Sequence, residues 1–114
     1  MKTIKSYTDL EQSKKLAKIL PLESADMLYW MGEYITHSYM EGQHKDEQIP
    51  IWSLAALFGV LPEGIRLLKA TNISSVGDIK YHCDCPKYNI DKWFDNPIDA
   101  CVAMIERLHE LKML

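Results

Sequence analysis

The stretch YHCDCP, residues 81–86, contains the residue types that could do chemistry. It places His82, Cys83 and Cys85 within four positions, and imidazole and thiolate groups serve as zinc ligands and as catalytic groups. Successive side chains of a strand point to opposite faces, so Cys83 and Cys85 would share one face and His82 would lie on the other. The same residues also fit a half-buried strand end, where thiols pack as small apolar groups.

A metal site at His82, Cys83 and Cys85 needs a second pair of ligands, as structural zinc sites have. The remaining cysteine, Cys101, falls on the buried stripe of a predicted helix. We therefore predict no metal and no cofactor, and keep as the alternative a small metal protein or enzyme that uses this cluster. A turn at residues 84–86 would favour the alternative, because it would bring the two faces of the strand together.

The three cysteines are an odd number without regular spacing, which indicates free thiols in a reducing compartment. A disulfide between Cys83 and Cys85 is not expected, because residues two apart on a strand lie about 6 to 7 Å apart with nearly parallel Cα–Cβ bonds. The first residues lack a signal-peptide pattern, and no apolar run approaches the length of a membrane span. These features predict a cytoplasmic protein that makes no membrane contact.

Tryptophan and tyrosine, three and six residues, greatly outnumber the two phenylalanines. Their polar edges suit ligand pockets and interfaces as well as cores. At least half of them should lie in the core of so small a domain. Trp30, Tyr81 and Trp93 are the candidates for a ligand pocket or a dimer interface, because they lie on predicted strands that could expose one face.

The composition fits one domain, residues 1–114, with a modest core, since 47% of the residues are hydrophobic. The net charge of −3 argues against binding to nucleic acid by phosphate neutralisation, which needs a basic face. The first eighteen residues do carry five lysines, although interspersed lysines on a helix are usually a solvated face. A weak nucleic-acid binder that uses this lysine face is kept as a second alternative.

The segment TDLEQSKKLAKILP, residues 8–21, predicts a first helix. Thr8, with Glu11 three residues later, matches a capping box, and apolar residues then recur at helical spacing. Pro21 ends the helix.

Residues 27–40 can be read in two ways. Large and aromatic side chains at 27–31 predict a strand, Gly32 and Glu33 a two-residue turn, and residues 34–40 a returning strand. The alternative is a single helix from Ser24 to Gly42, because the apolar residues also fit a period of 3.6.

The middle of the chain predicts a loop, a helix and a hairpin. Residues 41–48 are polar and should form an exposed loop. IPIWSLAALFGVLP, residues 49–62, has Pro50 at a helix start and is apolar nearly all round, so it predicts a short buried helix. Residues 65–70 and 78–84 are strand-like runs, and the Ser, Asn and Gly between them suit a hairpin loop.

Residues 94–114, FDNPIDACVAMIERLHELKML, predict a long amphipathic helix in which Asn96 is the cap and Pro97 the first residue. Its predicted buried stripe is Ile98, Cys101, Val102, Ile105, Leu108 and Leu111. The fold class is therefore α+β. We expect a small antiparallel sheet of three or four strands packed against an N-terminal helix, a short buried central helix and this long C-terminal helix.

Three segments resemble a known group of proteins: TDLEQSKKLAKILPLESADM, IPIWSLAALFGVLP and DNPIDACVAMIERLHELKML. The group consists of short uncharacterised proteins of gut anaerobic bacteria, their phages and mobile elements, and its segments have the same order. A weaker likeness, carried by IPIWSLAALFGVLP, the strands up to DKWFD and NPIDA, is to the small phage α-β-α sandwich domain. The resemblance implies a genomic setting and supplies no catalytic residues, and YHCDCP lies outside the matched segments.

No glycine-rich phosphate loop and no recognisable catalytic constellation occurs in the sequence. Together with the small size and the Trp/Tyr-rich strands, this predicts a non-enzymatic cytoplasmic binding or interaction protein of a phage or mobile element. A homodimer is the expected assembly, because pairing of sheet edges or of the C-terminal helix would cover surface that a small domain exposes. The sequence does not identify a protein partner or a small-molecule ligand.

Overall fold

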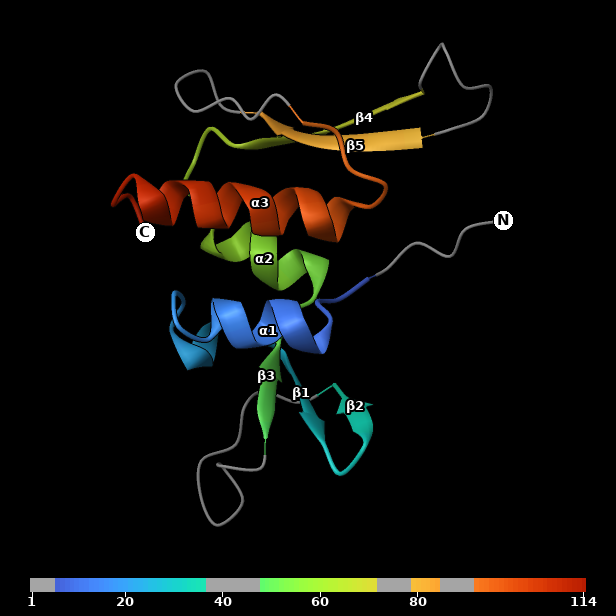
Figure 1. The fold of residues 1–114 in the computed structure, drawn as a ribbon, viewed down its shortest axis with the longest axis vertical. Helices are drawn as coiled ribbons and strands as arrows, with labels where there is room; N and C mark the ends of the chain where they lie inside the picture. The colour runs from blue at the N-terminus through green and yellow to red at the C-terminus, as the bar shows by residue number, and fades with distance from the viewer. Residues whose placement is uncertain (1–5, 37–47, 72–78, 85–91) are drawn as a thin grey trace.

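The computed structural model describes residues 6–36, 48–71, 79–84 and 92–114, and its elements are stacked in layers along the long axis of the molecule in an order that differs from chain order (Figure 1). In chain order they are α1 (Leu10–Leu16), the 3-10 helix η1 (Leu22–Ser24), β1 (Met27–Trp30), β2 (Glu33–Ile35), β3 (Ile49–Ile51), α2 (Leu54–Val60), β4 (Arg66–Thr71), β5 (Ile79–Asp84) and α3 (Pro97–Glu110). The class is α+β, as predicted.

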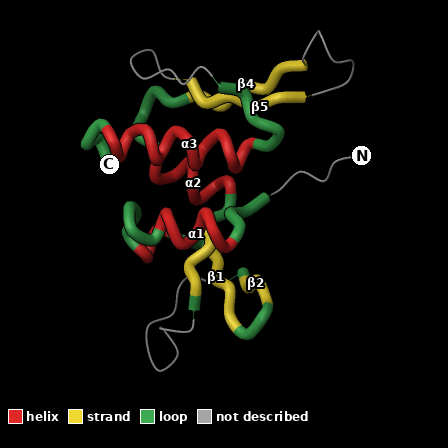
Figure 2. Tube along the Cα trace, viewed as in Figure 1, coloured by secondary structure: helices red, strands yellow, loops and turns green. Residues whose placement is uncertain are grey.

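The strands form two antiparallel sheets instead of the single sheet that the sequence suggested. One has the order β2-β1-β3 and the other is the hairpin β4-β5, which was predicted. Figure 2 shows the helices lying between the two sheets. The sheets therefore occupy opposite ends of the molecule, and α3 packs against β5 while α1 packs against β3.

A two-residue turn joins β1 to β2, so the alternative of one long helix is wrong. Trp30 pairs with Glu33, which leaves Met31 and Gly32 as the turn residues. Both have positive φ, 52° and 83°, as a type I′ turn requires. The predicted turn was one residue later, and residues 37–40 of the predicted returning strand lie outside the described part of the chain.

The prediction that a helix starts at Pro50 is wrong. Pro50 lies in β3, which pairs with β1, so the backbone at this position has the extended conformation of a strand. The helix begins only at Leu54, after Ser53, whose hydroxyl accepts a hydrogen bond from the backbone N–H of Ala56 at 3.2 Å. Proline is tolerated in β3 because this strand is at the edge of its sheet.

The capping box of α1 lies one residue later than predicted. The N-cap is Asp9, whose carboxylate accepts from the Gln12 N–H at 2.8 Å, while the Gln12 side chain accepts from the Asp9 N–H at 3.2 Å. Thr8 is buried instead. Its hydroxyl oxygen accepts from the Trp52 N–H at 3.2 Å and lies 2.7 Å from the Ser13 hydroxyl.

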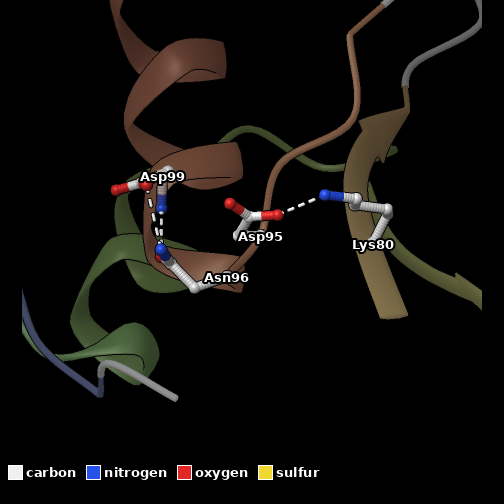
Figure 3. Close-up of polar contacts among 4 residues, drawn as sticks. All are labelled: Lys80, Asp95, Asn96 and Asp99. Atoms are coloured by element: carbon white, nitrogen blue, oxygen red, sulfur yellow. Dashed lines mark hydrogen bonds and ion pairs between the residues drawn. The ribbon is translucent and has the colours of Figure 1, made fainter. Parts of the chain in front are cut away.

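Polar contacts connect the N-terminus of α3 to α1 and to β5, and Figure 3 shows those at the helix start and to β5. The Asn96 side chain caps the helix as predicted, because its oxygen accepts from the Asp99 N–H at 2.8 Å. The Asp99 carboxylate accepts in turn from the Asn96 amide at 2.9 Å and from the Gln12 amide of α1 at 2.7 Å. Asp95 forms an ion pair with Lys80 of β5. These contacts fix the position of α3 against α1 and β5.

The main core lies where α3 meets α1, α2 and β5. The predicted stripe of α3 is confirmed except for Leu111, which is exposed because the helix ends at Glu110. Each buried aliphatic side chain contributes about 1.5 to 3 kcal/mol. In α2 the Leu57 side chain is fully buried whereas Phe58 is exposed, so this helix is less enclosed than its apolar sequence suggested.

In the segments that the structure describes, no helix is long and apolar enough to cross a membrane.

Candidate functional site

Two thiols meet in the core where β5 packs on α3. Cys83 of β5 is 2% exposed and Cys101 of α3 is fully buried, and their sulfur atoms lie 3.9 Å apart. Both are free cysteines. Tyr81 lies on the same face of β5 and is 7% exposed. The alternation predicted for this strand therefore orients Tyr81 and Cys83 toward the helix layer.

The two thiols differ in their readiness to ionise. Hydrogen bonding by the neighbouring Cys101 thiol lowers the pKa of Cys83 from the ordinary value of 9.0, although burial opposes this effect. The pKa of Cys101 is raised by the contact with Cys83, by burial and by the negative charge that Cys83 acquires. Cys83 is therefore the residue of the pair that becomes a thiolate first, and Cys101 retains its proton.

His82 lies on the opposite face of β5 and is 6% exposed. The Trp93 ring covers it, with ring centroids 5.0 Å apart and an interplanar angle of 26°. The His82 Nδ1 atom is 3.0 Å from the backbone oxygen of Lys92, and since a carbonyl only accepts, Nδ1 carries the proton. The imidazole is thus on the far side of the strand from Cys83 and is not placed to act as its base.

The structure does not gather the metal ligands that the alternative hypothesis requires. Within residues 6–36, 48–71, 79–84 and 92–114, no three His, Cys, Asp or Glu side chains form a group that could hold a metal ion. His82 and Cys83 point to different faces of β5. Cys85 lies outside the described residues, as does the possible turn at residues 85 and 86.

The three aromatic candidates do not form one site. Trp93 is 44% exposed on the outer face of the β4-β5 sheet, whereas Tyr81 is a core side chain whose backbone pairs with that of Phe94, with N···O distances of 2.7 and 2.8 Å. Trp30 is half-buried at the end of β1, in the other sheet. In Figure 1, β1 and β5 lie at opposite ends of the molecule.

Sequence reasoning missed two groupings. One is the pair Cys83 and Cys101, although each was expected on a buried face. The other is a tyrosine cluster between the β1-β2 hairpin and the residues before α1, in which the centroid of the Tyr34 ring lies 4.7 Å from that of Tyr7 and 5.0 Å from that of Tyr29. Tyr29 and Tyr34 are directly opposed across the hairpin. The correct turn position would have predicted that contact, because it sets the register.

β4 is the edge of the β4-β5 sheet. It pairs with β5 along all six of its residues, and Arg66 at its start forms an ion pair of 2.5 Å with Asp84. The other side of β5 is bridged by Phe94. Among the described residues, no strand pairs with the outer side of β4. Within the described residues, a row of backbone donors and acceptors along this edge therefore has no strand partner.

Comparison with known proteins shows that this chain is similar in sequence to part of an enzyme. L-lactate dehydrogenase 2 of Bacillus cereus (strain ATCC 14579) is 30% identical over 92 residues, which cover 75% of this chain and 25% of the dehydrogenase. The protein of the same name from Bacillus anthracis has the same identity and coverage. The L-lactate dehydrogenase of Bacillus licheniformis is 27% identical over 107 residues, or 89% of this chain and 30% of the enzyme.

The chain spans about a quarter of the length of the curated relatives that it matches. No protein-family profile matches it. No solved structure matches it either.

Proposed function

We propose that this chain is a non-enzymatic binding protein of a phage or mobile element and that it assembles as a homodimer through the outer edge of β4. The observation that carries the proposal is the open edge of this six-residue strand, the part of the β4-β5 sheet to which another strand can be added. The genomic setting rests on the resemblance of the three sequence segments described above. A cytoplasmic setting is part of the proposal because the buried cysteines are free thiols.

A two-stranded sheet is only marginally stable without additional strands or a packed helix. α3 covers one face of β4-β5, and no strand among the described residues pairs with the outer edge of β4, where a second chain could add. Antiparallel pairing of β4 with β4 of a second copy would create a continuous four-stranded sheet around a two-fold axis. A second copy is the simplest occupant because it brings an identical open edge.

The charges on β4 select the register of this pairing. A two-fold axis perpendicular to the sheet requires opposed residues of the two copies to have their side chains on the same face, so the axis must pass beside one residue of β4. The registers that pair the most residues of this strand are centred on Leu68 or on Lys69. Centring on Lys69 opposes two ammonium groups, which is unfavourable. Centring on Leu68 opposes two leucines and places each Lys69 opposite Leu67 of the other copy. We therefore propose the Leu68-centred dimer.

Native mass spectrometry of the full chain, purified without a metal-affinity step, tests the assembly. The wild-type protein should be a dimer at micromolar concentration, and Leu68→Glu and Leu68→Lys should each be monomers because like charges would be opposed at the axis. Mixing the two variants should restore a dimer that contains one copy of each. Lys15→Glu, on the exposed face of α1, is the control for a charge change away from β4 and should remain dimeric.

A monomeric wild-type protein, or dimers in both Leu68 variants, would refute this interface. The same spectra report any bound zinc, and a zinc-sized mass increment would support the alternative site at His82, Cys83 and Cys85. For the other alternative, the exposed lysines in α1 and just after it, at positions 14, 15 and 18, predict retention on heparin that falls steeply with salt. Absence of retention at low salt would remove the nucleic-acid hypothesis.

The match to lactate dehydrogenases supplies a different candidate, an activity on L-lactate or a related hydroxy acid. Hydride transfer needs a cofactor such as a nicotinamide dinucleotide, and the sequence lacks the glycine-rich loop that holds its pyrophosphate in many dehydrogenases. We expect no L-lactate-dependent reduction of the nicotinamide cofactor by the purified chain. Turnover above that of a protein-free control would overturn the non-enzymatic proposal.

A further inference from the structure

The buried thiols of Cys83 and Cys101 belong to different elements, β5 and α3, which pack against each other. The sulfurs are 3.9 Å apart, and a disulfide bond needs about 2.0 Å, so they must approach by about 1.9 Å. Cys83 sits on the β5 face that packs on α3, and the ion pair between Lys80 and Asp95 joins β5 to the start of that helix. Rotation of the two side chains is the movement that would shorten this distance.

We propose that Cys83 and Cys101 form a reversible intramolecular disulfide, which makes this contact an oxidation site that covalently joins β5 to α3. The inference rests on the distance between the sulfurs and on their burial, and it is independent of the proposed dimer. Both residues are free thiols, so the reduced form is the starting state of the reaction.

The chemistry balances with a peroxide as the oxidant. The Cys83 thiolate attacks one peroxide oxygen, the O–O bond breaks, and Cys83 becomes a sulfenic acid while hydroxide leaves and takes up a proton as water. The Cys101 sulfur then attacks the Cys83 sulfur, the S–S bond forms and the S–O bond breaks, and a second water leaves with the Cys101 proton. In total the two thiols lose two electrons, and these reduce hydrogen peroxide to two water molecules.

The assignment of roles follows from the environments of the thiols. Cys83 is the attacking residue because it ionises before Cys101 and because the thiolate is the reactive form. Cys101, fully buried beside it, resolves the sulfenic acid. Since both sulfurs are shielded from solvent, oxidation requires a transient opening of the β5–α3 contact, and it should be slower than oxidation of an exposed thiol.

The disulfide would close a ring from Cys83 to Cys101 that includes Trp93 and the first turn of α3. The oxidised protein would keep β5 attached to α3 even when local contacts open. A cross-link of this kind stabilises mainly by restricting the unfolded chain. We expect the thermal midpoint of the oxidised protein to rise by roughly 5 to 10 °C over the reduced protein.

The test is oxidation of the folded full-length protein with hydrogen peroxide, followed by denaturation, alkylation of the remaining thiols and intact-mass measurement. The reduced chain should take up three alkyl groups, one for each of its cysteines. The oxidised chain should lose about 2 Da and take up a single alkyl group, and dithiothreitol should reverse both changes.

Cys85 provides the matched control, because it lies two residues from Cys83 in the same segment. Cys85→Ser should still lose about 2 Da on oxidation and should then take up no alkyl group, whereas Cys83→Ser and Cys101→Ser should form no intramolecular disulfide. Circular dichroism of each variant before oxidation establishes that it is folded.

Two results would overturn the proposal. One is a wild-type or Cys85→Ser chain that keeps all its alkylatable thiols after prolonged exposure to peroxide. The other is a Cys83→Ser chain that still loses about 2 Da, which would show that Cys85 pairs with Cys101 instead. A thermal midpoint that falls on oxidation would refute the stabilising cross-link, and it can be measured in Cys85→Ser without interference from a third thiol.

Discussion

The Thr8 hydroxyl contacts two buried groups, although Thr8 lies outside α1. We therefore expect this residue to contribute substantially to the stability of the fold. It accepts from the Trp52 N–H and contacts the Ser13 hydroxyl, and all three residues are fully buried. Thr8→Val keeps the side-chain shape but leaves both partners unsatisfied, so it should lower the free energy of unfolding by about 2 to 3 kcal/mol. Ser13→Ala, the matched control, removes one partner and should cost about 1 kcal/mol.

Urea unfolding followed by tryptophan fluorescence measures both changes. In the double variant the combined loss should be smaller than the sum of the single losses, because the two residues share one interaction. An equal or smaller loss for Thr8→Val than for Ser13→Ala would argue against this account of the hydroxyl pair.

The cysteine pair makes the free energy of unfolding depend on pH, and Cys101 determines the sign of that dependence. Its pKa in the folded chain is raised above the ordinary value of 9.0, so its contribution to stability is complete below pH 9.0 and is lost as the pH rises further. Cys83 has a lowered pKa, so it adds stability with rising pH only until the unfolded thiol, with its ordinary pKa of 9.0, has also ionised, and above pH 9.0 this gain is smaller than the loss at Cys101. The unfolding free energy should thus fall above pH 9.0.

Cys101→Ala is the comparison, because tyrosines and lysines also titrate in this range. Its alkaline loss of stability, measured by urea unfolding under reducing conditions, should be shallower than that of the wild type. Identical slopes for the two proteins would indicate that Cys101 ionises normally in the fold.

At the scale of residues, the sequence predicted the pieces of this site but not their partners. The alternation of strand side chains correctly separated His82 from Cys83, and the helical period correctly buried Cys101. The periods of strands and helices show which face of an element is buried, but they do not show which other element packs on that face. The contact between β5 and α3, and with it the thiol pair, was therefore not predicted. The Asn96 cap was predicted because its signal is entirely local.

Among the elements, the β1-β2 hairpin carries a strained turn. Met31 adopts φ of 52° in a type I′ turn, a conformation that costs a residue with a Cβ roughly 1 to 2 kcal/mol, and its side chain is 79% exposed. Met31→Asn creates the favoured Asn-Gly turn with little loss of packing and should raise the free energy of unfolding by about 0.5 to 1 kcal/mol.

Met31→Val is the opposite control, because a β-branched side chain is still less compatible with positive φ, and it should be destabilising. Chemical unfolding of the wild type and of the two variants measures the free energy of unfolding of each. The turn assignment would be wrong if Met31→Asn were no more stable than the wild type.

The errors at the element scale have a common cause in tertiary pairing. Residues 49–51 have the apolar character of a buried helix, but pairing with β1 makes them a strand, and the sequence gives no local sign of that pairing. Thr8 matched a capping signal, yet its hydroxyl is used by Trp52 and the cap moves to Asp9. The long α3 was predicted well, because its cap, its proline and its apolar period all agree.

At the scale of the whole molecule, the strands are divided between two small sheets that lie at opposite ends of the helical layer. This arrangement leaves a large surface for the volume enclosed. Association of two copies along β4 would reduce this surface and add strands to the smaller sheet.

If the dimer is the stable form, thermal unfolding must depend on protein concentration, because dissociation accompanies unfolding. A tenfold increase in concentration should raise the wild-type thermal midpoint by roughly 2 to 5 °C. Leu68→Glu should show no such shift, whereas Lys15→Glu should behave as the wild type. A wild-type midpoint that stays constant over a hundredfold range would mean that the fold is stable as a monomer and that the edge of β4 has another partner or none.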